Sequence, residues 1–206
     1  IPWILMDRSP PADTGLFALL QWPVWKKAWK IVSKSKSAKG CIVSKGHQEL
    51  IQSKISISSD KFTIIPAGVD LELFYSSEKD EIFTMVYHGR LDKHRGVLAL
   101  PMLANKAVQS GIKLRLILIG EGDAYNQLQN ISESYDYIQV EQIMEQKKVA
   151  NILSKSHLGL LPMPETRLWS IASPLKRSEY AASGMMIFGI DHLGHQFPNS
   201  QTYQWM

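Results

Sequence analysis

An alternation of apolar runs with helix-like segments over residues 82–190 is the feature that most constrains the fold. The runs lack the polar–apolar alternation of strands with one solvent face, and continuous apolar strands between helices are typical of a parallel sheet covered on both faces. The sequence therefore predicts a doubly wound α/β domain of Rossmann-like type, in which ligands bind beyond the carboxyl ends of the strands. The expected strands are residues 82–87, 114–119, 137–140, 158–161 and 185–190, and the expected helices are residues 96–109, 123–131, 145–154 and 174–182.

The first third of the chain is less regular. The pattern predicts strands at residues 3–6 and 40–43, helices at residues 22–33 and 45–51, and a loop at residues 7–11. These strands are too few to close a domain. Either the two parts of the chain pack as one body, or the remainder of a first α/β domain is absent.

A break between the two parts is expected at residues 66–70. There the segment Pro-Ala-Gly-Val-Asp follows the apolar run of residues 62–65, and proline with glycine is typical of such a break. The sequence therefore predicts a hinge, with one domain over residues 1–69 and a second over residues 70–206.

Positive charge is concentrated before this hinge. Nine lysines and only two acids, Glu49 and Asp60, lie between Lys26 and Lys61, although the net charge of the whole chain is only +4. From Asp70 onward acids and bases roughly balance, which supports two domains with different electrostatic roles. The lysine-rich part carries no recognised nucleic-acid motif, so nucleic acid is not an expected partner.

Composition excludes several classes of protein. A hydrophobic fraction of 45% with 20% charged residues excludes a disordered, collagen-like or coiled-coil chain. A single cysteine, Cys41, excludes an internal disulfide and a thiolate metal cage, and the six histidines show no metal-ligand spacing. No apolar run approaches the roughly 20 residues that cross a bilayer, and no signal peptide precedes the first expected strand. We expect a cytoplasmic protein, and we interpret the start at Ile1 as that of a fragment.

Tryptophans recur at helical spacing in the lysine-rich part. Trp22, Trp25 and Trp29 alternate with lysines, as in helices that lie in a membrane interface. The same stripe is also produced by a helix that packs against its own domain, which is the more frequent case. Both interpretations stay open, and peripheral membrane contact is one of them.

Two turns follow expected strands of the second domain. The first carries Arg90 and Arg95 and leads toward a helix, so guanidinium groups and helix-end amides could bind one anion such as phosphate. The second carries Gly120 and Gly122 before Asp123, which is a suitable N-cap. Solvated loop arginines and an ordinary capped turn are the alternative interpretations.

A third segment near the end begins a helix. Ser173 is the expected N-cap, Pro174 the first helical residue and Gly184 the end. Glu179 falls about one and a half turns into this helix, where a carboxylate could accept hydrogen bonds from vicinal hydroxyls such as those of a ribose. A surface glutamate paired with a neighbouring base is the alternative.

Taken together and in this order, the segments resemble the family 4 glycosyltransferases, which are nucleotide-sugar enzymes with the two-domain GT-B fold. The resemblance covers residues 40–190. The matching pieces are Gly40-Cys41-Ile42-Val43-Ser44, residues 64–74, His88-Gly89-Arg90-Leu91 with Arg95-Gly96, Leu118-Ile119-Gly120-Glu121-Gly122, Leu160-Leu161-Pro162, and Pro174-Leu175-Lys176 with Glu179-Tyr180-Ala181-Ala182-Ser183-Gly184.

The resemblance implies that the second domain binds a UDP- or GDP-sugar donor. By this analogy Arg90, Arg95 and Lys176 bind the diphosphate and Glu179 binds the ribose, while the loop after Val140 holds the base. Ile171 stands where the family often has a glutamate that contacts the transferred sugar, and Lys176 or Ser173 takes over that role. The residues that the resemblance places along the donor cleft are Gly89, Gly120, Glu121, Gly122, Ser173, Pro174 and Leu175.

The resemblance also implies the reaction. A hexosyltransferase of this family moves the sugar to a glycan, lipid or small-molecule acceptor with retention of configuration, and it needs neither a metal nor another cofactor. The expected catalytic histidine and most of the acceptor half would lie before Ile1, and the loop at residues 7–11 would border the acceptor site. Two alternatives stay open, a non-catalytic module that binds a nucleotide sugar and a nucleotide-sugar epimerase of the same fold.

Overall fold

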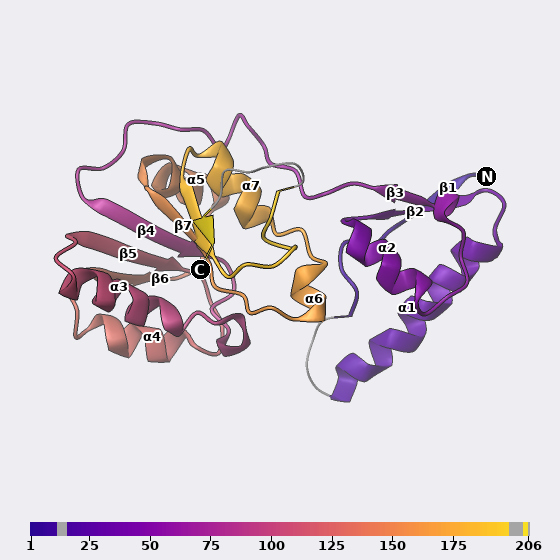
Figure 1. Cartoon of the computed structure of the whole chain (residues 1–206), viewed down its shortest axis with the longest axis horizontal. Helices are drawn as coiled ribbons and strands as arrows, with labels where there is room; N and C mark the ends of the chain where they lie inside the picture. The colour runs from indigo at the N-terminus through magenta and orange to yellow at the C-terminus, as the bar shows by residue number, and fades with distance from the viewer. Residues whose placement is uncertain (12–15, 198–203, 206) are drawn as a thin grey trace. The chain divides into compact units, whose positions relative to one another are not determined.

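The computed structural model of the chain describes residues 1–11, 16–197 and 204–205 (Figure 1). The chain divides into two compact units. Unit 1 comprises Ile1–Ala67 together with Thr166–Ser173, and unit 2 comprises Gly68–Glu165 together with Pro174–Met206.

Unit 2 is built around one parallel sheet. Its strand order is β6-β5-β4-β7-β8-β9, and every neighbouring pair is parallel. In Figure 1, α3 and α4 cover one face of the sheet, and α5 and α7 cover the other. The strands are β4 (Phe83–His88), β5 (Leu114–Ile119), β6 (Ile138–Glu141), β7 (Leu158–Leu161), β8 (Met186–Gly189) and β9 (Gln204–Trp205). The helices are η2 (Lys93–Arg95), α3 (Ala99–Gln109), α4 (Tyr125–Ser132), α5 (Gln146–Lys155) and α7 (Leu175–Ala182).

This strand order confirms the doubly wound α/β fold expected from the sequence. The first strand of the unit, β4, lies in the middle; the chain adds β5 and β6 on one side and then crosses to add β7, β8 and β9 on the other. The order therefore reverses between β4 and β7, where Met85 pairs with Leu158. In open α/β sheets ligands bind at this reversal, beyond the carboxyl ends of the strands.

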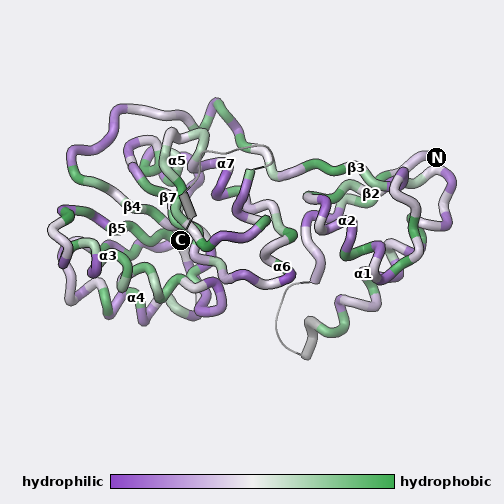
Figure 2. Tube along the Cα trace, in the orientation of Figure 1, coloured by the Kyte–Doolittle hydropathy of each residue, from purple (hydrophilic) through white to green (hydrophobic). Residues whose placement is uncertain are grey.

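The strands form where the sequence supplies continuous apolar runs. Met85, Val86 and Tyr87 of β4 and residues 116–119 of β5 are buried, because helices cover both faces of the sheet. Figure 2 shows the central strands as largely hydrophobic. A Cβ at Gly159 would collide with the ring of Tyr180, so this glycine allows α7 to pack directly on β7.

Unit 1 contains a second, smaller parallel sheet of order β1-β2-β3. Its strands are β1 (Trp3–Met6), β2 (Ala38–Ile42) and β3 (Phe62–Ile64), and its helices are α1 (Leu16–Lys34), α2 (Lys45–Gln52), η1 (Ser59–Lys61) and α6 (Arg167–Ser170). Helices α1 and α2 lie along the same side of the sheet in Figure 1. Their shared core consists of Trp29, Val32, Ala38, Ile42, Ile51 and Ile55.

Of the three tryptophans in the α1 stripe, Trp29 is buried in the core of unit 1, and Trp22 and Trp25 are partly buried. Trp29 is fully buried, and a Cβ at Gly40 of β2 would collide with its ring. The indole Nε1 atoms of Trp25 and Trp29 donate hydrogen bonds of 2.7 and 2.8 Å to Oδ2 of Asp7. The structure therefore supports the packing interpretation of Trp25 and Trp29 rather than insertion of these rings into a membrane.

Helix starts differ from the predictions at three places. Helix α1 begins at Leu16 and contains Pro23, so it is longer than expected. Asp123 does not cap α4, because its Oδ1 accepts a 2.7 Å hydrogen bond from the backbone amide of Lys93. Ser173 does not cap α7, because its hydroxyl accepts a hydrogen bond from the amide of Ala67.

The sequence pattern did not predict every helix and strand of the structure. Helix α6 and strand β9 were not predicted, and residues 93–98 form η2 and turns rather than the start of the helix expected at residue 96. Parts of the expected second domain, residues 198–203 and 206, lie outside the described residues. Within the described ranges, none of the helices has the length and apolar character needed to cross a membrane.

Candidate functional site

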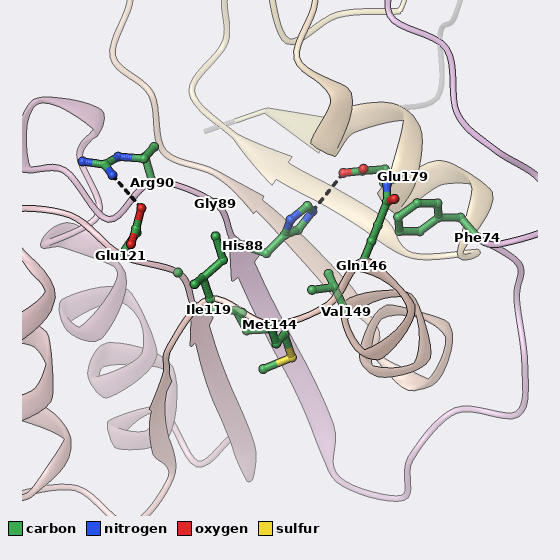
Figure 3. A pocket seen from close by; sticks show the side chains of 12 residues that line it. Phe74, His88, Gly89, Arg90, Ile119, Glu121, Met144, Gln146, Val149 and Glu179 are labelled. Atoms are coloured by element: carbon green, nitrogen blue, oxygen red, sulfur yellow. Dashed lines mark hydrogen bonds and ion pairs between the residues drawn. The ribbon is translucent and has the colours of Figure 1, made fainter.

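A hollow of about 310 Å³ lies in unit 2 at the carboxyl ends of β4 and β5. This is the edge of the sheet where the strand order reverses, and it is the position predicted for a ligand. Figure 3 shows Arg90 near one end of the hollow and Glu179 near the other, with His88 and Gly89 between them. Its lining residues are Phe74, His88, Gly89, Arg90, Ile119, Gly120, Glu121, Ile143, Met144, Gln146, Val149 and Glu179.

The arginine end of the hollow is held by carboxylates. Arg90 Nη1 lies 3.1 Å from Glu121 Oε1, and Arg90 Nη2 lies 3.1 Å from Asp92 Oδ1. The side chains of Arg90 and Glu121 are 52% and 61% exposed. An ion pair this exposed contributes little to stability, so an incoming anion can replace Glu121 at the guanidinium at small cost.

Asp92 joins the two predicted arginines. Its Oδ2 lies 3.3 Å from Nε of both Arg90 and Arg95. Burial raises the pKa of Asp92, but the hydrogen bonds and charge of Arg90 outweigh it and hold this pKa below its usual range. The ionised carboxylate therefore keeps both guanidinium groups next to the turn that follows β4.

Lys176 adds a third cation beside the same turn. Its Nζ lies 5.3 Å from the ring centroid of Tyr87, and a Cβ at Gly89 would come within 2.9 Å of Nζ. Burial, together with the positive charge of Arg95, lowers the pKa of Lys176 to about 8, and Glu179 acts in the opposite direction. An anion bound beside Lys176 would stabilise its charged form, which burial and the neighbouring Arg95 disfavour.

The two glycine turns pack against each other below these cations. Gly120 has a φ of 147°, and a Cβ there would collide with the carbonyl oxygen of Gly89. The amide of Gly89 donates a 2.8 Å hydrogen bond to Ile119 O. Only residues without a side chain allow this close approach, so the floor of the hollow is backbone that a ligand can reach.

Glu179 forms the opposite end of the hollow. It is buried on α7, and its Oε2 lies 3.1 Å from His88 Nε2 (Figure 3). Burial lowers the pKa of His88 despite the opposing effect of Glu179, so the imidazole is neutral at pH 7. Apart from this contact with His88, no hydrogen bond to Oε2 is formed among the described residues, so this oxygen can accept hydrogen bonds from hydroxyl groups of a ligand.

His88 is itself held in place from α7. Its ring meets the ring of Tyr180 edge to face with the centroids 5.4 Å apart, and its backbone amide donates a 3.4 Å hydrogen bond to the hydroxyl of Tyr180. His88 thus connects the end of β4 with the carboxylate of Glu179. This connection fixes the direction in which Glu179 faces the hollow.

An apolar wall completes the site. Phe74 is fully buried, Val149 is buried on α5, and Ile143 is 70% exposed on the loop after β6. Met144 lies beside Val149 in Figure 3. A wall of this composition suits a flat, weakly polar group such as a nucleobase.

The remaining sequence-predicted residues lie outside this lining. The hollow is not lined by Arg95, Lys176, Gly122 or Leu175. A Cβ at Gly122 would come within 2.5 Å of Asp92 Oδ1. Pro174 is the N-cap residue of α7. Ser173 and Ile171 belong to unit 1, where the carbonyl of Ile171 accepts a 2.6 Å hydrogen bond from the hydroxyl of Ser44.

Sequence reasoning did not assign several residues that line the hollow. His88 and Phe74 stand inside segments that carry the family resemblance, and their positions next to Gly89 and within residues 64–74 were the available signal. Met144, Gln146 and Val149 carry no local signal, because only the fold brings the loop after β6 and the start of α5 to this edge. Among the described residues, no group of three or more metal-ligating side chains is present.

Comparison with known proteins supports the fold. No protein-family model matches the sequence, and a comparison with curated proteins gives no match. Among solved structures, the chain is similar to the glycosyltransferase WaaG of lipopolysaccharide biosynthesis, with a TM-score of 0.68, 13% identity, and coverage of 95% of this chain and 58% of WaaG. It is also similar to the pneumococcal O-GlcNAc transferase GtfA in complex with UDP and GlcNAc, with a TM-score of 0.61, 20% identity, and coverage of 78% and 32%.

A third similar structure is AviGT4, a glycosyltransferase of avilamycin A biosynthesis, with a TM-score of 0.56, 17% identity, and coverage of 74% of this chain and 48% of that one. The chain thus has the fold of GT-B glycosyltransferases, with a Rossmann-like sheet in unit 2. It spans between about a third and three fifths of the length of these three proteins.

Proposed function

We propose that unit 2 binds a nucleotide-diphosphate sugar and that the chain is part of a glycosyltransferase. One observation carries this proposal: Arg90 and Glu179 line the same hollow at the reversal point of the sheet, with backbone and an apolar wall between them. GtfA, one of the similar structures, is a complex with UDP and GlcNAc, and this supports UDP as the first nucleotide to test.

The proposed binding mode divides the donor between the hollow and the two cations that lie beside its arginine end. Arg90, Arg95 and Lys176 bind the diphosphate, and Arg90 exchanges Glu121 for phosphate oxygens. Glu179, oriented by His88, accepts hydrogen bonds from the ribose hydroxyls. The base lies against the apolar wall near the loop after β6.

The proposed reaction follows from this charge arrangement. The bond between the anomeric carbon and the β-phosphate oxygen breaks, and its electron pair leaves with the nucleoside diphosphate. A bond to the acceptor oxygen forms as the acceptor hydroxyl transfers its proton to the departing phosphate oxygen. Negative charge grows on the β-phosphate in the transition state, where preorganised cations stabilise it most. We propose hexosyl transfer with retention, in which these three cations perform the role that a metal has in other transferases.

The acceptor side of the proposal concerns unit 1. WaaG acts in lipopolysaccharide biosynthesis, which supports a glycan or lipid-linked acceptor. The side chain of Asp7 is engaged with Trp25 and Trp29, so the exposed Arg8 and Ser9 are the members of the loop at residues 7–11 that we expect at an acceptor site. Peripheral contact with a membrane belongs to the same proposal.

One observation favours a second candidate, a non-catalytic module that binds the donor. Ile171 occupies the position where the family resemblance expects a glutamate, and it is buried in unit 1, where a Cβ at Gly46 would lie 2.8 Å from its Cγ2. A module of this kind would bind nucleoside diphosphates with the same residues and would not cleave the sugar donor.

The experiment that tests the proposed function combines binding and turnover. Isothermal titration with UDP and GDP, followed by release of UDP or GDP from the corresponding hexose donors, is measured on the chain and on Arg90→Ala and Glu179→Ala. The proposal predicts binding of at least one diphosphate and a loss of roughly tenfold or more in affinity in each variant. Binding without donor cleavage supports the module, and no binding of either nucleotide by the parent chain contradicts both.

A further inference from the structure

Gln146 is a polar residue beside the apolar wall of the hollow. It is the first residue of α5, and it lines the hollow together with Phe74, Met144 and Val149. In Figure 3 its side chain extends from α5 toward the end of the hollow that holds Glu179. A flat ligand that lies on this wall would therefore meet the carboxamide of Gln146.

The carboxamide of Gln146 is not used within the chain. Other polar side chains of the lining lie in pairs, Arg90 with Glu121 and His88 with Glu179. Gln146 is exposed, and in the described part of the chain its side chain forms no hydrogen bond or ion pair. A carboxamide has one acceptor oxygen and two N–H donors. All of these are available to a ligand in the hollow.

We infer that the carboxamide of Gln146 forms hydrogen bonds with the edge of the nucleobase and that this base is uracil. The inference rests on the proposed function, which places the base against the apolar wall, and it adds the identity of the base and the residue that recognises it. Uracil presents its N3–H group between two carbonyl oxygens. The oxygen of Gln146 accepts from N3–H while its NH2 group donates to a neighbouring carbonyl, so either carbonyl of uracil completes the pair.

The apolar wall disfavours the other common bases. Adenine, cytosine and guanine each carry an exocyclic amino group with two N–H donors, whereas Gln146 has a single acceptor oxygen. No side chain of the neighbouring wall offers an oxygen or nitrogen atom to the second donor, since the wall consists of Phe74, Ile143, Met144 and Val149. A buried donor without a partner costs affinity, and an unpaired carbonyl oxygen is tolerated more often.

The size of the hollow favours the same base. Its volume of about 310 Å³ lies at the lower end of the range of roughly 300–1,000 Å³ that is usual for ligand pockets. A pyrimidine has one ring, whereas a purine has two fused rings. Hydrogen bonding and size therefore both favour uracil over adenine and guanine, and hydrogen bonding favours it over cytosine.

The test is calorimetric titration with UDP, 3-methyl-UDP, CDP and GDP. The methyl group at N3 removes the base donor of UDP. The variant is Gln146→Leu, which has a similar size and helix propensity. Its matched control is Gln142→Leu, at an exposed glutamine of the preceding loop that does not line the hollow. Titration with inorganic pyrophosphate, which has no base, reports whether the arginine end of each variant is intact.

We expect the parent chain and Gln142→Leu to bind CDP, GDP and 3-methyl-UDP roughly tenfold or more weakly than UDP. Gln146→Leu should bind UDP roughly fivefold to thirtyfold more weakly than the parent chain does, because two neutral hydrogen bonds are lost. Its affinity for 3-methyl-UDP should change by less than about twofold, since that ligand already lacks the pairing. Its affinity for pyrophosphate should equal that of the parent chain.

Three results would overturn the inference. The first is UDP affinity that Gln146→Leu retains. The second is a loss in Gln146→Leu that is equal for UDP and 3-methyl-UDP, or that Gln142→Leu shares, because Gln146 would then not contact N3–H. The third is tighter binding of CDP or GDP than of UDP by the parent chain. The proposed function would survive all three, and it would fail together with the inference if the parent chain bound none of the nucleotides.

Discussion

Asp7 in unit 1 and Glu179 in unit 2 are both buried carboxylates, with 8% and 7% of their surfaces exposed, but their surroundings differ. Each has a histidine Nε2 nearby, His47 at 3.3 Å from Asp7 and His88 at 3.1 Å from Glu179. Asp7 also accepts hydrogen bonds from the indoles of Trp25 and Trp29, whereas Glu179 faces a hollow. Burial alone therefore does not distinguish a structural carboxylate from one that binds a ligand. The distinguishing feature is a carboxylate oxygen that faces a hollow and can still accept hydrogen bonds from a ligand.

The largest expected effect is on the stability of unit 1. Replacing Asp7 by Ala leaves two indole donors without their acceptor, so we expect the free energy of unfolding to fall by about 3 kcal/mol. Urea denaturation checks this prediction. Glu49→Ala, an exposed acid on α2, is the control and should leave the free energy of unfolding almost unchanged. If Asp7→Ala instead weakened UDP binding with little loss of stability, the contrast between the two carboxylates would fail.

The second largest effect is expected for UDP affinity when Glu179 is replaced. The variant Glu179→Ala should fold with nearly parental stability and lose roughly 10- to 100-fold in affinity for UDP, because hydrogen bonds to a charged group contribute about 1.5–3 kcal/mol. Affinity for 2′-deoxy-UDP should already be low in the parent and should change much less in the variant. Calorimetric titration with both nucleotides makes the measurement, and equal losses for the two would argue against ribose contact.

The affinity for UDP should depend on pH through the ionisation of Lys176. Its pKa is lowered to about 8, mainly by burial, so the cation is lost as pH rises through this value. The diphosphate is already ionised above pH 7. We therefore expect UDP affinity to fall between pH 7 and pH 9 in the parent chain and to be flat over this range in Lys176→Met. The exposed Lys106→Met serves as the matched control and should retain the parental profile.

The lowered pKa of Lys176 should also affect stability, but stability should rise with pH where UDP affinity falls. Between about pH 8 and the unfolded value of 10.5, the unfolded chain binds the proton that folded Lys176 has lost. The free energy of unfolding should therefore rise with pH in this window by the contribution of this group. The difference between the parent chain and Lys176→Met, measured by urea denaturation at both ends of the window, isolates that contribution.

The smallest effect is expected at His88, which acts through Glu179. The variant His88→Ala should reduce UDP affinity by roughly threefold to tenfold, and His88→Gln, which retains a donor, should restore part of it. In a Glu179→Ala background the His88 substitution should change affinity little, since the group that it orients is gone. Additive losses in this double-mutant cycle would show that His88 contributes independently of Glu179.

The sheet of unit 2 could be predicted because its signal is local. Residues 114–119, which are apolar except for Arg115, and residues 158–161, which combine leucines with Gly159, have the same bounds as β5 and β7. Helix starts were less predictable. Asp123 and Ser173 are ordinary N-cap residue types, but their oxygens bind the amides of Lys93 and Ala67, partners that are distant in sequence.

Part of the site could be predicted because some of its residues also carry a local sequence signal. Gly89, Arg90 and Glu179 stand in recognisable segments, and the fold brings them to one hollow. The apolar wall of Phe74, Met144 and Val149 could not be predicted, because its members come from separate segments that only the tertiary structure assembles. The membrane interpretation of α1 depended on knowing which side of the helix is buried, and the tryptophan spacing alone does not show this.

The central claim is that the two ends of the hollow bind two halves of one ligand. The most direct measurement is calorimetric titration of the parent chain, Arg90→Ala and Glu179→Ala with UDP, uridine and inorganic pyrophosphate. The account predicts that Arg90→Ala weakens UDP and pyrophosphate but not uridine, and that Glu179→Ala weakens UDP and uridine but not pyrophosphate. Losses that do not separate in this way, or UDP affinity that both variants retain, would contradict it.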